Sequence, residues 1–144
     1  MQKTGKKISP AQLKDAVISS MADKKAQQII CLNMEKLTSS VSDFFVICEG
    51  TSSVQVQAIA RAVEEGVYKL TGEHVYHSEG ERNAEWILLD YVDVVVHIFQ
   101  PEVRKFYNLE GLWGDAEREE VMIEPHYKQH VSNERKRAKI SATS

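Results

Sequence analysis

The segment EWILLDYVDVVVHIF, from Glu85 to Phe99, constrains the fold of this chain more than any other. It contains two apolar runs that are separated only by residues 91–93. This pattern predicts two short strands joined by a tight turn, which makes the strands antiparallel neighbours. A parallel pair would need a crossover connection of about a dozen residues or more. A sheet with every strand parallel is therefore excluded.

Helix and strand signals also precede this hairpin. Ser9, Pro10 and Gln12 predict the capped start of a helix that ends near Lys24. Two short runs rich in Ile, Val and Phe, QIICLNM and DFFVICE, predict two strands over residues 28–34 and 43–49. These elements and the hairpin indicate an α/β fold in which helices pack on a mixed β-sheet.

A second helix is predicted between Ser52, with Gln55 as its capping-box partner, and Gly72. Gly66 weakens this helix by about 1 kcal/mol relative to alanine. The helix has an apolar stripe made of Val56, Ile59, Ala60, Val63, Val67 and Leu70.

The elements around the hairpin are a short strand near Val75, a loop around Gly80, and a last helix that begins at Pro101. Past Asp115 the apolar pattern decays. The last helix has a broad apolar face made of Val103, Phe106, Tyr107, Leu109, Leu112 and Trp113.

Length and composition indicate one domain. The 144 residues suffice for a single core, and no apolar run reaches the roughly 18 residues of a membrane helix. We predict a flexible segment over residues 1–8, a single domain over 9–123 and a basic, flexible tail over 124–144.

MQKTGKKISP resembles neither a secretory signal nor a transit peptide, so we expect a cytoplasmic protein. Cys31 and Cys48 lie in apolar runs, which predicts buried thiols.

The charge is distributed unevenly along the chain. From Lys128 to Ser144 there are five basic residues against Glu134, a net charge of +4, so residues 1–127 carry −7 and the whole chain −3. An acidic body is a poor platform for nucleic acid but suits a basic protein partner.

The polar residues that could perform chemistry fit structural roles better than catalytic ones. Asp90 and Asp93 could hold divalent ions, but their odd spacing across a turn aims them differently, and aspartate is favoured in turns. His97 lacks a nucleophile with a recognisable signature, and serine capping explains GTSS at residues 50–53. The histidine pairs His74 with His77 and His126 with His130 lack a third ligand. We therefore expect no catalytic residue, metal or cofactor.

The strand that contains Trp86 is apolar on both faces. Trp86, Leu88 and Asp90 point to one side, and Ile87, Leu89 and Tyr91 point to the other. The second face must be covered by this chain's own helices, by a second copy of the chain, or by another protein. Tryptophan and tyrosine are enriched in binding hot spots.

Three segments resemble the ribosomal silencing factor family, also called the Iojap family: DFFVICEGTSSVQVQAIA, EGERNAEWILLDYVDVVVHIF and RKFYNLEGLWGDA. The resemblance covers about residues 23–116. The chain departs from the family pattern at Phe44, where tyrosine is usual, and at Val92, where glycine is common. A valine at a positive φ would be strained, so the turn is a point of difference.

The resemblance implies a non-enzymatic translation factor with a nucleotidyltransferase-like fold that lacks the catalytic acids. Such a factor binds the large ribosomal subunit, chiefly through a basic ribosomal protein on the joining face (the fourteenth of that subunit). It thereby blocks docking of the small subunit and represses translation. We expect the contacts to come from Trp86 as the anchor, with Leu88, Asp90, Tyr91, Asp93 and His97.

Two other functions and one other assembly are compatible with the sequence. A nucleotidyltransferase-like enzyme would bind nucleotides and divalent ions. An RNA-binding ribosome assembly factor would use the basic tail to contact neighbouring rRNA, with a steep salt dependence. A homodimer formed through the apolar face would compete with ribosome binding.

Overall fold

The computed structural model describes residues 8–37 and 40–122. The segment before residue 8 and the predicted basic tail over 124–144 lie outside these residues. The elements, in chain order, are α1 (Pro10–Asp23), β1 (Gln27–Asn33), β2 (Phe44–Glu49), α2 (Ser53–Thr71), β3 (His77–Glu79), β4 (Trp86–Asp90), β5 (Val94–Phe99), α3 (Pro101–Tyr107), α4 (Leu109–Leu112) and β6 (Glu117–Glu120).

The described residues form a six-stranded mixed sheet with the order β3-β4-β5-β2-β1-β6. β4 and β5 pair antiparallel, with Leu88 opposite His97, so the predicted hairpin is confirmed. β2 and β5 pair parallel, with Ile47 opposite His97. The sheet is therefore mixed, as predicted, because the connection between β2 and β5 contains the long helix α2.

Strand β6 is not predicted from the sequence, because its residues, EREE, have neither apolar alternation nor β-branched side chains. It pairs antiparallel with β1 and forms one edge of the sheet. Charged side chains suit an edge strand, since they discourage pairing with other chains. Long-range pairing with β1, and not local preference, makes this segment a strand.

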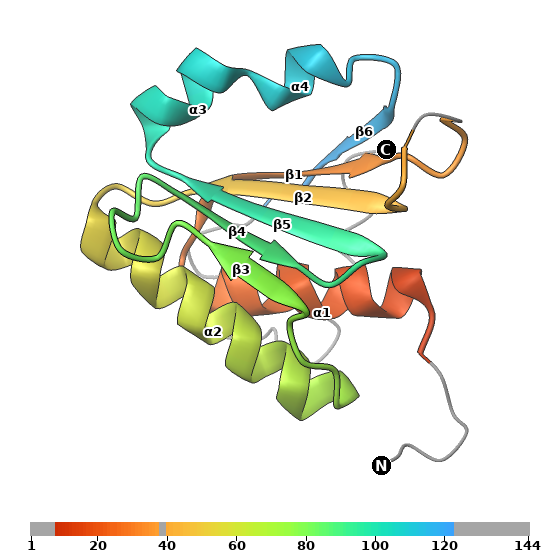
Figure 1. Ribbon diagram of the computed structural model, residues 1–144, viewed down its shortest axis with the longest axis horizontal. Coiled ribbons are helices and arrows are strands. Elements are labelled where there is room, and N and C mark those ends of the chain that lie inside the picture. Colours follow the sequence, from red (N-terminus) through yellow and green to blue (C-terminus); the bar gives the residue numbers. More distant parts are fainter. Residues whose placement is uncertain (1–7, 38–39, 123–144) are drawn as a thin grey trace.

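The sheet separates two layers of helices. Figure 1 shows α1 and α2 on one side of the sheet and α3 and α4 on the other. The larger core lies between the sheet and the helices α1 and α2, and it includes Cys31 on β1 and Cys48 on β2. A smaller core lies between the sheet and the helices α3 and α4. Both thiols are buried, as predicted, and burial raises the pKa of each.

The helix ends follow their predicted caps with one exception. Ser9 and Gln12 form the full capping box on α1. In α2, Ser52 accepts a hydrogen bond from the Gln55 backbone N–H, but the Gln55 side chain turns to Thr51 instead of closing the box. Gly72 ends α2 at a φ of 82°. The predicted stripe of α2 is buried except for Leu70, which is 64% exposed because it lies beyond the edge of the core.

The predicted last helix is divided in two. Asn108 has a φ of 47°, and this left-handed residue ends α3 and begins α4. Its side-chain Oδ1 accepts a hydrogen bond from the Gly111 N–H, which stabilises the break. The apolar face is therefore shared between two short helices: Leu109 is buried, and Phe106, Tyr107 and Leu112 are exposed.

Val92, the residue at which the sequence predicts a strained turn, has a positive φ. Its φ is 78°, and its side chain is exposed in the turn between β4 and β5. The Asp90 carboxylate accepts a hydrogen bond from the Val92 N–H at 2.7 Å, which stabilises the turn. The interpretation of Asp90 as a turn residue is thus confirmed. Among the described residues no helix is long and apolar enough to cross a membrane.

Gly66 has a packing role that its helix preference conceals. A Cβ atom at this position would lie 2.1 Å from Ser20 Oγ and 3.0 Å from Ser20 Cβ on α1. We expect Gly66→Ala to lower the free energy of unfolding by about 1 to 2 kcal/mol, because overpacking outweighs the gain in helix preference. Urea unfolding measures this change.

A double-mutant cycle with Ser20→Ala controls for other effects. The Ser20 hydroxyl donates to the Ala16 carbonyl within α1, so its removal alone leaves the helix pair intact. In the Gly66→Ala protein, Ser20→Ala removes the hydroxyl oxygen that lies closest to the new Cβ atom. The double variant should therefore recover part of the lost free energy of unfolding. A Gly66→Ala variant more stable than the wild type would show that the helices can separate freely.

Candidate functional site

The candidate site is the open half of the sheet face opposite α1 and α2, which we call the outer face. α3 and α4 cover only part of this face (Figure 1). Beneath them Ile30, Ile47 and Phe99 are buried. Beyond them Trp86 and Leu88 on β4 remain partly exposed, so the strand is not covered by helices on both sides.

An aromatic cluster lies at the boundary between the covered and open halves. Trp86 packs on Phe99 and on Tyr107, with ring centroids 4.9 and 4.8 Å away. The next contacts in the cluster are Phe45 with His97 at 4.8 Å and with Trp113 at 5.8 Å. We call the cluster the aromatic patch; it comprises Phe45, Trp86, His97, Phe99, Tyr107 and Trp113.

His97 forms the buried base of the aromatic patch. It is 4% exposed, and Trp86 Nε1–H donates a hydrogen bond to its Nδ1 at 3.1 Å. Burial lowers the pKa of His97 from its usual 6.5 to about 4, so the ring is neutral near pH 7. A neutral, buried imidazole next to aromatic rings acts here as a hydrogen-bond acceptor for the tryptophan.

Carboxylates surround the end of the outer face where β2 and β5 begin. We call Asp43, Asp90 and Asp93 the acidic rim. Burial raises the pKa of Asp43, and the negative charges of Asp93 and Glu35 add to this. None of the acidic rim forms an ion pair with another described residue. The rim therefore presents negative charge that a basic partner could neutralise.

The six predicted contact residues do not share one face. Trp86, Leu88 and Asp90 lie on the outer face, as the alternation predicts, and Asp93 is exposed in the turn. Tyr91 lies on the opposite face, in the core with α1 and α2, where it is 7% exposed. Four of the six, Trp86, Leu88, Asp90 and His97, thus share the outer face; Asp93 lies in the turn that follows Asp90, and Tyr91 is on the opposite face.

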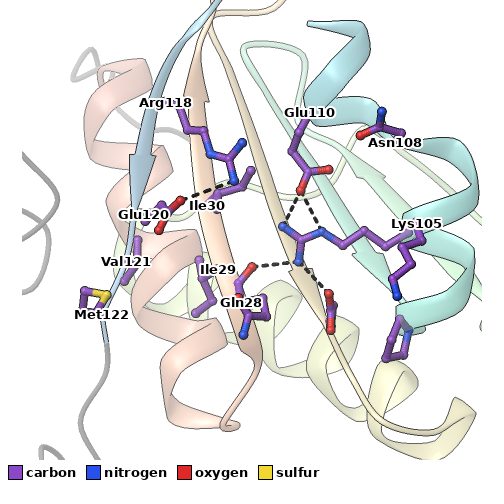
Figure 2. Close-up of a pocket in the computed structure, with 13 residues that line it drawn as sticks. Gln28, Ile29, Ile30, Lys105, Asn108, Glu110, Arg118, Glu120, Val121 and Met122 are labelled. Atoms are coloured by element: carbon purple, nitrogen blue, oxygen red, sulfur yellow. Dashed lines mark hydrogen bonds and ion pairs between the residues drawn. The ribbon is translucent and has the colours of Figure 1, made fainter. Parts of the chain in front are cut away.

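Arg104 fastens α3 and α4 to the sheet. Its guanidinium donates to the Gln28 carbonyl at 2.8 Å, to Glu49 at 3.1 Å and twice to Glu110, at 3.0 and 2.7 Å. All four of these residues line a groove between α3 and β6, and their bonds are among the dashed lines in Figure 2. Burial by itself raises the pKa of Glu110, but the hydrogen bond and charge of Arg104 outweigh it and lower the pKa.

The groove in Figure 2 has a volume of about 540 Å³ and mixed polarity. Its charged lining consists of Arg104, Lys105, Arg118, Glu49, Glu110 and Glu120, with equal numbers of each sign. Arg118 and Glu120 pair at 3.4 Å, so the lining does not select a ligand by net charge. Among the described residues no group of three His, Cys, Asp or Glu side chains could hold a metal ion.

The histidine pairs considered as metal ligands have other roles where they are described. His77 pairs with Glu79 at 2.8 Å, and His74 packs against Tyr68 with ring centroids 4.6 Å apart. His126 and His130 lie outside the described residues.

Comparisons with known proteins place these features in a family. The model of the family described as "Ribosomal silencing factor during starvation" matches residues 7–144. The chain belongs to the ribosomal silencing factor family. One relative, a ribosomal silencing factor of Halalkalibacterium halodurans, is 44% identical over 109 residues, which cover 76% of this chain and 92% of the relative. The resemblance of the three motifs is thereby confirmed.

More distant relatives and a solved structure extend this picture. A crystal structure of a protein from Chromobacterium violaceum has a TM-score of 0.70 and 36% identity, covering 74% of this chain and 88% of that one. A mouse protein named for mitochondrial assembly of the ribosomal large subunit is 28% identical over 102 residues, covering 69% of this chain and 44% of its own length. The α/β fold is thus confirmed by a member with a solved structure.

Several residues of the aromatic patch of this ribosomal silencing factor are not predicted as contacts from the sequence. Phe45, Tyr107 and Trp113 fall within predicted elements but not in the predicted contact surface. For Phe45 the alternation of DFFVICE is a usable signal, since Phe44 and Val46 point to one face and Phe45 to the other. Tyr107 and Trp113 have no such signal, because their exposure depends on the break at Asn108.

Proposed function

We propose that this ribosomal silencing factor acts in the cytoplasm by binding the large ribosomal subunit through the aromatic patch and acidic rim, which represses translation. The open half of the outer face carries this proposal. It combines partly exposed aromatic rings, which are enriched in binding hot spots, with carboxylates that lack a described counter-charge. The mouse relative, whose name refers to the large subunit, supports the choice of subunit.

The proposed partner is a basic ribosomal protein on the joining face, the fourteenth of the large subunit. Residues 1–127 carry a net charge of −7, so a basic partner would be attracted at a distance as well as at the contact. Basic side chains facing the acidic rim would orient the partner, while its apolar groups cover Trp86 and Leu88.

The proposed mechanism requires only that the protein stays bound to the joining face of the large subunit; it involves no covalent chemistry. A factor seated on the joining face occupies volume that the small subunit needs. A protein–protein interface of standard size, which buries roughly 1,600 Å² in total, is enough for stable binding. Trp86, Leu88, Asp90 and Asp93 are the proposed contacts. Tyr91 and His97, which the sequence also predicts as contacts, are buried and would support the contact residues from below.

Trp86→Ala should weaken binding to purified large subunits by about 2 kcal/mol, or roughly 30-fold. The Trp86 indole lies on β4 beside the open half of the outer face, and its loss removes the proposed anchor. Co-sedimentation with isolated subunits measures the change, and the yield of joined ribosomes measures its consequence. Wild-type protein that sediments only with small subunits would contradict the proposal.

Two further variants separate binding from folding. Tyr68→Ala removes an exposed aromatic ring from α2, on the other side of the molecule, and should leave binding unchanged. Asp93→Lys reverses an exposed charge whose side chain makes no described ion pair, so the fold should persist while binding weakens. If Asp93→Lys binds like the wild type, Asp93 is not part of the interface.

The same assay distinguishes an RNA-binding assembly factor, a function that the mouse relative's name favours as a second candidate. Deletion of residues 127–144 removes the basic residues of the tail and none of the residues of the aromatic patch or the acidic rim. Binding that survives deletion with a shallow salt dependence supports the proposed protein contact, whereas loss of binding favours rRNA contact by the tail. A homodimer through the aromatic patch would appear as a dimer that large subunits dissociate.

A further inference from the structure

The hydrogen bond between Trp86 and His97 links the proposed anchor to the sheet beneath it. Trp86 lies on β4 opposite Phe99, and His97 lies two residues before Phe99 on β5. The two side chains are therefore diagonal neighbours on the outer face. At 3.1 Å the bond restricts rotation of the indole about its side-chain torsions.

The bond also fixes the tautomer of the imidazole. An indole N–H can only donate, so His97 Nδ1 must be unprotonated to accept it. The neutral ring then carries its proton on Nε2. This Nε2 atom is buried and has no hydrogen-bond partner among the described residues. A buried donor without an acceptor destabilises the folded state.

Histidine is consequently a poor residue for stability at this position. A leucine of similar volume would fill the same space without an unpartnered N–H. What leucine cannot do is accept the hydrogen bond from Trp86. The feature that distinguishes histidine from an apolar residue here is therefore its acceptor atom, and that atom faces the proposed anchor.

We infer that His97 is a positioning residue, which holds the Trp86 indole in the orientation that a basic partner protein docks against. This inference rests on the proposed function of the aromatic patch. His97 itself is 4% exposed and acts through Trp86. Immobilising a side chain before binding removes part of the entropy loss on docking, an effect of up to about tenfold in affinity.

Two substitutions separate positioning from packing. His97→Leu retains apolar volume and removes the acceptor. His97→Gln supplies a side-chain oxygen that can accept from Trp86 Nε1–H. We expect His97→Leu to unfold at the same temperature as the wild type or higher, and to bind purified large subunits up to about tenfold more weakly. His97→Gln should recover most of that affinity.

Nuclear magnetic resonance tests the bond without ribosomes. The Trp86 indole N–H should exchange with solvent faster in His97→Leu than in the wild type, and His97→Gln should restore slow exchange. The Trp113 indole in the same spectrum is the internal reference. Nitrogen shifts of the wild-type imidazole should show the proton on Nε2.

The outcomes separate this inference from the proposed function. Unchanged indole exchange in His97→Leu would overturn the inference, and so would a lower unfolding temperature with wild-type affinity. Equal loss of affinity in both variants would also overturn it. Failure of the wild type to bind large subunits would instead remove the proposed function, while the exchange measurements would still report whether His97 holds the indole.

Discussion

Arg104→Met is expected to lower the free energy of unfolding by about 3 to 5 kcal/mol. The Arg104 side chain is only 8% exposed, and its two carboxylate partners, Glu49 and Glu110, are 17% and 16% exposed. Methionine fills much of the same volume but cannot donate. Both glutamates would then be left largely buried without their hydrogen-bonded counter-charge, and the Gln28 carbonyl would lose its donor.

The neighbouring residue provides a matched control. Lys105→Met removes one positive charge from an exposed position of the same helix and should change the free energy of unfolding by less than about 0.5 kcal/mol. Arg104→Lys should fall between the two, because an ammonium cannot reproduce the fork that reaches three partners. Urea unfolding of the three variants tests this order. Similar losses for Arg104→Met and Lys105→Met would mean that the ion cluster contributes little.

The role of Arg104 also bears on the candidate site. Its partners lie on β1, β2 and α4, so one side chain ties the short helices to the sheet. α3 carries Tyr107, which packs on Trp86, and Trp113 follows α4 and packs on Phe45. Loosening this connection should disturb the aromatic patch. We therefore expect Arg104→Met to weaken binding to large subunits even at temperatures where it remains folded.

Local signals are sufficient to predict most of the fold. The capping residues locate α1 and α2, and the tight turn after Asp90 determines the antiparallel pair within a mixed sheet. Two features escape prediction because they depend on distant contacts. β6 is a strand only through its pairing with β1, and the helix after Pro101 breaks at Asn108, whose left-handed conformation no apolar pattern reveals.

For a similar reason, the sequence predicts which residues of the candidate site share a face of β4 but not which face is open. Alternation along β4 correctly separates Trp86 and Leu88 from Tyr91. It does not indicate which side faces outward, because both sides of the strand are apolar. That choice is made by the helices: the long pair α1 and α2 covers the Tyr91 side, whereas the short pair leaves Trp86 partly open (Figure 1).

The acid sensitivity of the protein should depend measurably on His97. Burial lowers the pKa of His97 from 6.5 to about 4, so the unfolded chain takes up a proton at this residue before the folded protein does. Stability from the neutral ring is complete above pH 6.5 and is lost as the pH falls toward 4. Between pH 7 and pH 4 this loss amounts to about 3 kcal/mol.

Comparison with His97→Leu isolates this contribution, because carboxylates that titrate in the same range are present in both proteins. Urea unfolding at pH 7, 5.5 and 4 should show the wild type losing about 3 kcal/mol more than the variant over the whole interval. Protonation at Nδ1 would also break the bond from Trp86, so the indole N–H should become exposed to exchange in the same pH range. If the free energy of unfolding depends on pH in the same way in both proteins, the imidazole becomes charged in the folded protein as easily as in the unfolded chain. The surroundings of His97 would then be more accessible to water than its 4% exposure indicates.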